Sequence, residues 1–71
     1  MHRYRTADGV EITIETTRSN LAIYKACREA GLLRNQTHSA LDYAADESGI
    51  TVYRLRDGAS ILELERVKQD A

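Results

Sequence analysis

Two copies of one short pattern constrain the fold of this chain more than any other feature. A tyrosine-arginine pair is followed two residues later by aspartate-glycine, first from Tyr4 and again from Tyr53, in a chain of 71 residues. Aspartate-glycine between alternating apolar residues indicates a β-hairpin, because glycine adopts positive φ without steric cost. The sequence therefore predicts a hairpin near each end. We interpret the recurrence as shared turn chemistry and not as a duplication, because the elements between the hairpins do not repeat in tandem.

The register of the first hairpin follows from its loop. A three-residue loop, Ala7-Asp8-Gly9, gathers the apolar side chains on one face, whereas a two-residue Asp8-Gly9 turn would place arginine beside isoleucine. The expected pairs are Thr6 with Val10, Tyr4 with Ile12, His2 with Ile14, Arg5 with Glu11 and Arg3 with Thr13. One face is then apolar and the other charged, as in a half-buried antiparallel pair.

The second hairpin is expected over Ile50 to Leu55 and Ala59 to Val67, around the loop Arg56-Asp57-Gly58. The same loop type pairs Leu55 with Ala59, Tyr53 with Ile61 and Val52 with Leu62. That register predicts one face of Ile50, Val52, Leu62 and Leu64, and a second face of Tyr53, Leu55, Ala59 and Ile61. Both faces are apolar near the turn, unlike those of the first hairpin. Residues 68–71 are expected to fray.

Between the hairpins, apolar residues recur at helical spacing. Ser19 or Asn20 can cap a first helix that ends at Gly31, and its inner stripe would carry Ile23, Ala26, Cys27 and Ala30. Thr37 can cap a second helix that ends at Gly49. The inner face of that helix would carry Ala40, Leu41 and Ala44, and its outer face Ser39, Asp42 and Asp46.

The order ββααββ predicts a single α+β domain over residues 1–71. We expect an antiparallel sheet of about four strands, formed by the two hairpins, with two short helices packed on one face. The β-grasp arrangement is one topology that fits, and the strand order stays open. Because the chain has no Trp or Phe, its core must be built from Ile, Leu and Val with tyrosines at the edges.

Size and cysteine content narrow the class of protein. A chain this short buries a small share of its surface, so it depends on covalent or metal cross-links or on partners. Cys27 is the one cysteine, and no clustered His or Cys spacing suits zinc. We therefore expect no disulfide, no metal or other cofactor, and a cytoplasmic location. No apolar run approaches the roughly 20 residues of a membrane span, so no membrane partner is expected.

Charge argues against a nucleic-acid partner. The formal net charge is −1, with +2 in residues 1–37 and −3 in residues 38–71, whereas nucleic-acid binders usually carry a clear basic excess. A helix-turn-helix is also disfavoured, because its second helix would be acidic. A small nucleic-acid-binding transcriptional regulator is nevertheless the alternative function. Its basic side chains would be Arg3, Arg5, Arg18 and Arg34, or Arg54 with Arg56.

The second face of the later hairpin is the predicted interaction surface. If the helices cover the other face, this one is left as an apolar patch with a basic rim, which is typical of protein interfaces. The predicted protein-interface residues are Tyr53, Leu55, Ile61, Arg54 and Arg56. We expect contact with another protein chain, either a second copy in a homodimer or a larger target.

A second predicted surface is acidic. Asp42, Asp46 and Glu47 lie on the outer side of the expected second helix. Such a surface could occupy the basic groove of a nucleic-acid-handling protein by imitating phosphate charge, or it could be an ordinary solvated helix face.

No residue pattern points to catalysis. Cys27 falls on the inner stripe of the first helix, where a single cysteine usually serves as a small core residue. Neither His2 nor His38 has a spacing that implies the base of a nucleophile. Since no phosphate-binding loop or dinucleotide fingerprint occurs either, we expect no enzyme and no catalytic residues.

In size and composition the chain is similar to small accessory proteins of phages and mobile elements, including anti-CRISPRs and other inhibitors of host defence. That similarity implies a compact α+β domain that acts by protein contact alone. The sequence therefore leads to one hypothesis, a cytoplasmic, non-enzymatic interaction module that inhibits or regulates by binding.

Overall fold

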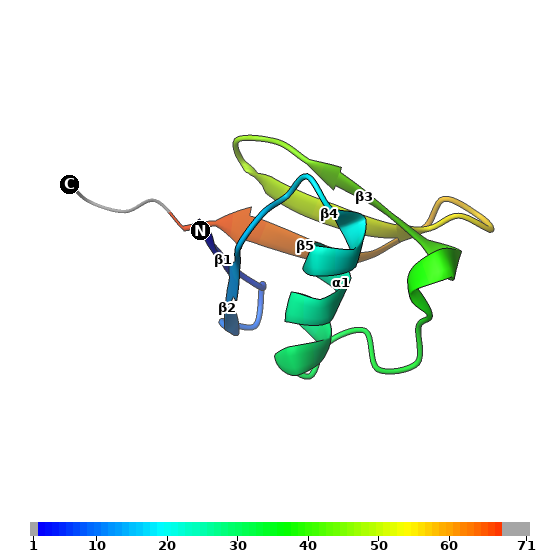
Figure 1. The fold of residues 1–71 in the computed structure, drawn as a ribbon, viewed down its shortest axis with the longest axis horizontal. Helices are drawn as coiled ribbons and strands as arrows, with labels where there is room; N and C mark the ends of the chain where they lie inside the picture. The colour runs from blue at the N-terminus through cyan, green and yellow to red at the C-terminus, as the bar shows by residue number, and fades with distance from the viewer. Residues whose placement is uncertain (1, 68–71) are drawn as a thin grey trace.

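The computed structural model describes residues 2–67, and the expected frayed tail at 68–71 lies outside the described residues. Its elements are β1 (His2–Arg5), β2 (Glu11–Ile14), α1 (Asn20–Glu29), the 3₁₀ turn η1 (His38–Ala40), β3 (Leu41–Ala45), β4 (Gly49–Arg54) and β5 (Ser60–Arg66). The strands form one antiparallel sheet in the order β2-β1-β5-β4-β3 (Figure 1). The α+β class is confirmed. The sheet has five strands and one α-helix, where the sequence predicted about four strands and two helices.

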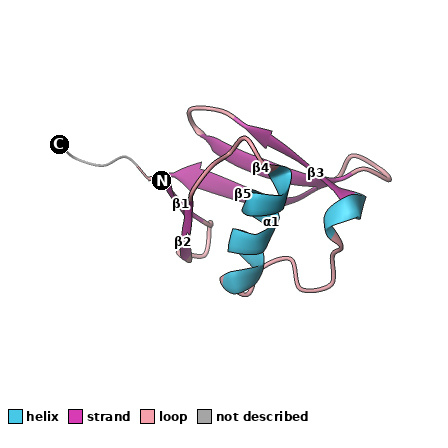
Figure 2. Ribbon diagram, viewed as in Figure 1, coloured by secondary structure: helices cyan, strands magenta, loops and turns pink. Residues whose placement is uncertain are grey.

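The core lies between the sheet and α1. The helix lies over one face of the sheet, and the β1–β2 hairpin stands steeply against the long strands β4 and β5 (Figure 2). The buried apolar side chains of the core are Tyr4, Ile12, Ile14, Ile23, Cys27, Leu41, Tyr43, Ile50, Val52 and Leu64. Within residues 2–67, no helix covers the opposite face of the sheet.

The first hairpin has the predicted register. All four strand pairs from His2 with Ile14 to Arg5 with Glu11 are present, and Thr6 N donates to Val10 O at 2.9 Å across the three-residue loop. The hydroxyl of Thr6 also accepts from Val10 N at 3.0 Å. Gly9 has a φ of +92°, which is the backbone conformation that the loop requires of glycine.

The first helix is also as predicted. Ser19 is its N-cap, and the Ser19 hydroxyl accepts from Ala22 N at 3.2 Å. Ile23 and Cys27 are completely buried, because they face the sheet at helical spacing. Beyond the helix, Leu32 N donates to Cys27 O at 2.8 Å, which satisfies a carbonyl of the last turn.

The predicted second helix is wrong. The segment after Thr37 makes only the short turn η1 and then enters strand β3. Leu41 and Tyr43 are buried, and Asp42 between them is only half-buried, which is the alternation of a strand. Tyr43 pairs with Val52 of β4. Burial of these two side chains against a neighbouring strand outweighs the local helical preference of an alanine-rich segment, because propensity is a weak term beside tertiary packing.

Gly49, which was expected to stop that helix, instead begins β4. It pairs with Glu65, and a Cβ at this position would collide with the carbonyl oxygen of Leu64 on β5. Glycine is therefore required here by the close approach of two strands and not by the end of a helix.

The second hairpin keeps only part of its predicted register. Val52 pairs with Leu62 as expected, but an irregularity between Val52 and Tyr53 makes Tyr53 pair with Ser60 instead of Ile61. The expected pair of Leu55 with Ala59 is also replaced, because Arg54 N donates to Ala59 O at 2.9 Å. The loop therefore spans residues 55–58, one residue more than the loop of the first hairpin.

A neighbouring strand explains why similar sequences turn differently. Leu55 N donates to Ala40 O at 3.1 Å, which extends the pairing of β4 with β3 and removes Leu55 from its place opposite Ala59. The first loop has a Thr6 hydroxyl to accept Val10 N, whereas the Asp57 carboxylate accepts Ala59 N at 3.1 Å in the second. The repeated tyrosine-arginine and aspartate-glycine pattern therefore forms a different turn in each hairpin.

None of the helices within residues 2–67 combines the length and the apolar character that a crossing of the bilayer would require.

Candidate functional site

The loop between β4 and β5 is held by its own charged side chains. Arg54 donates to Asp57 through two nitrogens, Nε to Oδ1 at 3.3 Å and Nη2 to Oδ2 at 2.9 Å. Gly58 N donates to Arg54 O at 2.7 Å. The hydrogen bond from Ala59 N, followed by the contact with Arg54, holds the pKa of Asp57 below its usual value. These bonds order the loop before any partner arrives.

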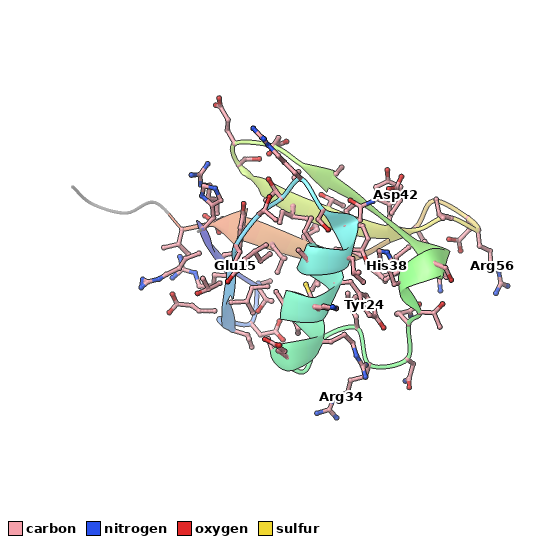
Figure 3. The ribbon with its side chains drawn as sticks, viewed as in Figure 1. Glu15, Tyr24, Arg34, His38, Asp42 and Arg56 are labelled. Atoms are coloured by element: carbon pink, nitrogen blue, oxygen red, sulfur yellow. The ribbon has the colours of Figure 1, made fainter. Side chains whose placement is uncertain are left out.

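Leu55 is the most exposed large apolar side chain of the described residues, at 59% exposure, compared with 45% for Leu21 and 37% for Val10. It begins the loop that projects from the body at the end away from β1 and β2 (Figure 1). Arg56 points outward from the same loop (Figure 3). An apolar and a cationic side chain are thus presented together at the end of the hairpin.

Tyr53 lies two residues before Leu55 and is fixed across the sheet. Its hydroxyl donates to Asp42 Oδ2 of β3 at 3.1 Å, and this hydrogen bond raises the pKa of Tyr53. Tyr53 is half-buried, so its ring still presents surface. The predicted interface residue Tyr53 is therefore a rigid group at the border of the exposed loop.

The register of Ile61 differs from the prediction, and Ile61 is half-buried. The irregularity beside Val52 displaces Ile61 from its place opposite Tyr53, and Ile61 packs against the buried core. Arg54 is committed to Asp57. Of the five predicted interface residues, the structure leaves Tyr53, Leu55 and Arg56 as an outward-facing group, which we call the hairpin-end surface.

The predicted acidic residues lie on β3 and in the turn that follows, not on a helix. Asp42 Oδ1 accepts from Tyr43 N at 2.9 Å, and its second oxygen accepts the Tyr53 hydroxyl. Asp46 Oδ1 accepts from Ser48 N at 2.8 Å, from Ser48 Oγ at 2.6 Å and from Gly49 N at 3.1 Å. Both carboxylates therefore hold the strand and the turn together, while Glu47 is exposed in the turn.

Asp46 should make the stability of the protein depend on pH. The hydrogen bonds from Ser48 and Gly49 lower the pKa of Asp46, so its stabilising effect is complete above the unfolded-state pKa and is lost as pH falls through the folded-state pKa. We expect Asp46→Ala to unfold at lower urea concentration than the wild type at pH 7. The difference should shrink below about pH 4, near the ordinary range of aspartate.

Urea titrations at pH 7, 4 and 3 measure this effect, with Glu47→Ala as the matched control because Glu47 is the exposed neighbour in the same turn. An Asp46→Ala deficit that stays constant across these pH values would contradict a role for the charged carboxylate.

A cluster of three aromatic rings, which the sequence did not predict, lies beside η1 at the border of the core. The rings of Tyr24 and His38 lie 5.5 Å apart, and those of His38 and Tyr43 lie 6.0 Å apart. The Tyr24 hydroxyl donates to Gln36 O at 2.6 Å, and Tyr24 and His38 appear side by side in Figure 3. Placing Tyr43 on a helix concealed the group, since only the strand brings Tyr43 to His38.

Cys27 is suited to packing and not to nucleophilic attack. Its side chain is completely buried, and desolvation raises the pKa of the thiol to about 11. Burial likewise raises the pKa of the nearby Tyr43 to about 12. Both groups are neutral at pH 7. Within residues 2–67, no three His, Cys, Asp or Glu side chains are placed to hold a metal ion.

A shallow groove of about 340 Å³ lies on the sheet between the first hairpin and the β3–β4 turn. Its charged lining residues are Arg5, Asp46, Glu63 and Glu65. The groove is a product of the strand order, which brings β1 beside β5, and nothing in the sequence pattern pointed to it.

Comparisons of the chain with protein-family models, with curated proteins and with solved structures gave no match.

Proposed function

We propose that this protein acts by binding another protein chain through the hairpin-end surface, as an inhibitor or regulator and not as an enzyme. The occupant of that surface is either a second copy or a larger target. The position and exposure of Leu55 carry the proposal.

Leu55 supports the proposal because it is both exposed and pre-ordered. A projecting loop that is already held by the Arg54–Asp57 ion pair loses little conformational freedom on binding. Tyr53 and Arg56, which flank Leu55 in sequence, are of the types that contribute most to protein interfaces. A bound partner would remove the most exposed large apolar side chain of the described residues from water.

The internal use of two arginines, Arg28 and Arg54, favours a protein partner over a nucleic acid. Arg28 Nη1 donates to Leu33 O at 3.0 Å and to Arg34 O at 2.8 Å, and Arg54 is paired with Asp57. These guanidinium groups are engaged within the chain, whereas phosphate binding needs several available cations. Moreover, the helix-turn-helix alternative lacks its second α-helix, since strand β3 occupies that segment.

The acidic residues remain a candidate second surface for a basic target. Asp42→Lys and Asp46→Lys would be poor tests of that idea, because each substitution also removes hydrogen bonds that hold β3 or its turn. Loss of binding in such variants would report on folding as much as on charge.

Leu55→Asp tests the proposed surface. If the protein self-associates through this loop, the variant should be monomeric at concentrations where the wild type is dimeric. The expected weakening is about tenfold or more, since a buried leucine contributes about 1.5–3 kcal/mol. Sedimentation equilibrium between about 10 and 500 μM measures it. For a larger target, the same variant should weaken capture of that target from a lysate of the cells in which the protein occurs.

Leu21→Asp and Val10→Asp are matched controls, because both residues are large, apolar and exposed but lie outside the hairpin-end surface. If all three variants behave alike in both assays, the exposed apolar side chain at the loop has no special role and the proposal fails.

A further inference from the structure

The two edges of the sheet differ in how well they are closed to another strand. The strand order leaves β2 and β3 at the edges. An edge strand presents outward N–H and C=O groups that can pair with a strand of another chain, unless its own structure blocks them. The alternation of antiparallel hydrogen bonding identifies which residues point outward on each edge.

On β3, the chain occupies most of its own outward donors. Asp46 N donates to Gly49 O, and Leu55 N donates to Ala40 O. The backbone N–H and C=O groups of even-numbered residues of β3 therefore point toward β4, and those of odd-numbered residues point outward. Of the outward donors, Leu41 N bonds His38 O, and Tyr43 N bonds the Asp42 side chain. A fixed carboxylate oxygen at Tyr43 N would repel the carbonyl of any added strand. Strand addition is therefore blocked from Leu41 to Tyr43, and we call this edge closed.

On β2, the outward donors are open. The hydrogen-bonded pair of Thr6 with Val10 makes Ile12 and Ile14 face β1 through their backbone, which leaves the N–H and C=O groups of Glu11 and Thr13 directed away from the sheet. Within residues 2–67, β2 pairs with β1 and with no other strand, so no strand lies beside these groups. Both residues are exposed, so an extended segment could reach them.

The side chains of β2 indicate which kind of segment fits. Glu11 and Thr13 are exposed, as is Glu15 directly after the strand, whereas Ile12 and Ile14 are buried toward α1. Arg5 of β1 lies opposite Glu11, but neither glutamate forms an ion pair with another described residue. An added strand would therefore place alternate residues beside two unpaired carboxylates, and its intervening residues beside the apolar core.

A second copy of this chain fits the edge poorly. Antiparallel self-pairing centred on Thr13 would set Glu11 opposite Glu15 of the other copy, and like charges directly opposite are destabilising. Self-pairing centred on Ile12 would place the Glu11 side chains of the two copies diagonally across the strand pair. Long side chains still interact at that separation, so the two negative charges would again repel each other. Lysine or arginine in the added strand replaces this repulsion with attraction.

We propose that the β2 edge accepts an extended segment of a partner protein by strand addition, and that this segment alternates basic with apolar residues. The N–H and C=O groups of Glu11 and Thr13 supply the main-chain pairing, and Glu11 and Glu15 select the basic side chains. The proposal does not rest on the hairpin-end surface, which lies at the other end of the molecule (Figure 1), and it would stand if Leu55→Asp had no effect.

A capped seven-residue peptide of alternating lysine and valine provides the test, with glutamate in place of lysine as the charge control. Nitrogen-15 NMR spectra of the full chain should show the lysine peptide, at millimolar concentration, shifting the Glu11 and Thr13 amides and protecting them from hydrogen exchange. The Tyr43 amide on the closed edge should not change, and the glutamate peptide should have no effect.

Thr13→Pro is the decisive variant, because proline removes an outward N–H without removing a bond of the β1–β2 ladder. It should weaken binding of the lysine peptide about tenfold, while Thr13→Val, which keeps the N–H, should bind as the wild type does. The proposal is overturned if the peptide leaves Glu11 and Thr13 unchanged, if the glutamate peptide acts equally, or if Thr13→Pro binds like Thr13→Val.

Two further outcomes remain decisive. Concentration-dependent protection of Glu11 and Thr13 without peptide would show that the occupant is a second copy and would overturn the basic segment. If Thr13→Pro does not fold, the amide shifts and exchange rates of the wild type with the two peptides decide the question alone.

Discussion

Alanine at Gly49 is expected to remove most of the stability of this protein. The new Cβ would collide with the carbonyl oxygen of Leu64, a backbone atom that cannot move without separating β4 from β5. Gly49 is also buried and its N–H bonds Asp46, so the shift would disturb the turn as well. We expect a loss of about 4 kcal/mol or more in the free energy of unfolding. Natural proteins have roughly 0.05–0.15 kcal/mol of stability per residue, so a chain of 71 residues has about 4–11 kcal/mol in total.

Urea unfolding followed by far-ultraviolet circular dichroism measures this loss. Gly9→Ala is the matched control, since Gly9 also has positive φ but nothing lies within 4 Å of its Cβ position. The control should cost only the roughly 1–2 kcal/mol of a left-handed backbone. If Gly49→Ala is no less stable than Gly9→Ala, the close approach of the two strands is wrong.

Alanine at Ile23 should give the second large effect. Ile23 is completely buried between α1 and the sheet, and truncation of a buried isoleucine typically costs about 2–5 kcal/mol through lost burial and the cavity left behind. Alanine is the better helix former, so any loss of stability comes from packing and not from the helix itself.

Leu21→Ala is the internal control on the same helix, because Leu21 is 45% exposed and its truncation should cost at most about 0.5 kcal/mol. Chemical unfolding of both variants at pH 7 gives the comparison. Equal losses would mean that α1 does not face the sheet as the structure has it.

The features predicted correctly from sequence are those set by near neighbours. The loop of the first hairpin depends on Thr6 and Gly9, and its register on the alternation that gathers Tyr4 and Ile12 on one face. The start of α1 depends on one hydroxyl, that of Ser19, and on a donor three residues away. Interactions of such short range can be identified from spacing and residue type.

The errors share a different cause. A helix over residues 37–49 satisfies local propensity, yet β3 forms because Tyr43 finds Val52 on another strand. The second loop lengthens because Leu55 N is taken by Ala40 O, 15 positions earlier in the chain. Ile61 is moved out of its predicted register by the irregularity beside Val52, and it packs on the core. The residues next to Ile61 in the sequence carry no signal of this change in register.

The candidate surfaces divide along the same line. Sequence identified Tyr53, Leu55 and Arg56 as exposed interface types, and it identified the charge of Asp42 and Asp46. Only the structure shows that Arg54 is paired within its loop, that both aspartates are hydrogen-bonded within the chain, and that the outward donors of β2 are open. Each of these facts depends on which strands are neighbours.

The sequence by itself therefore determined the α+β class, the first hairpin, the helix that carries Ile23 and Cys27, and the residue types available at the surface. These follow from interactions within a few positions along the chain. The tertiary structure decided the five-strand order, the strand in place of a second helix, the shift at Ile61 and the contrast between the two sheet edges. Pairing between distant segments buries more apolar surface and satisfies more backbone groups than local preference can, and so it prevails wherever the two conflict.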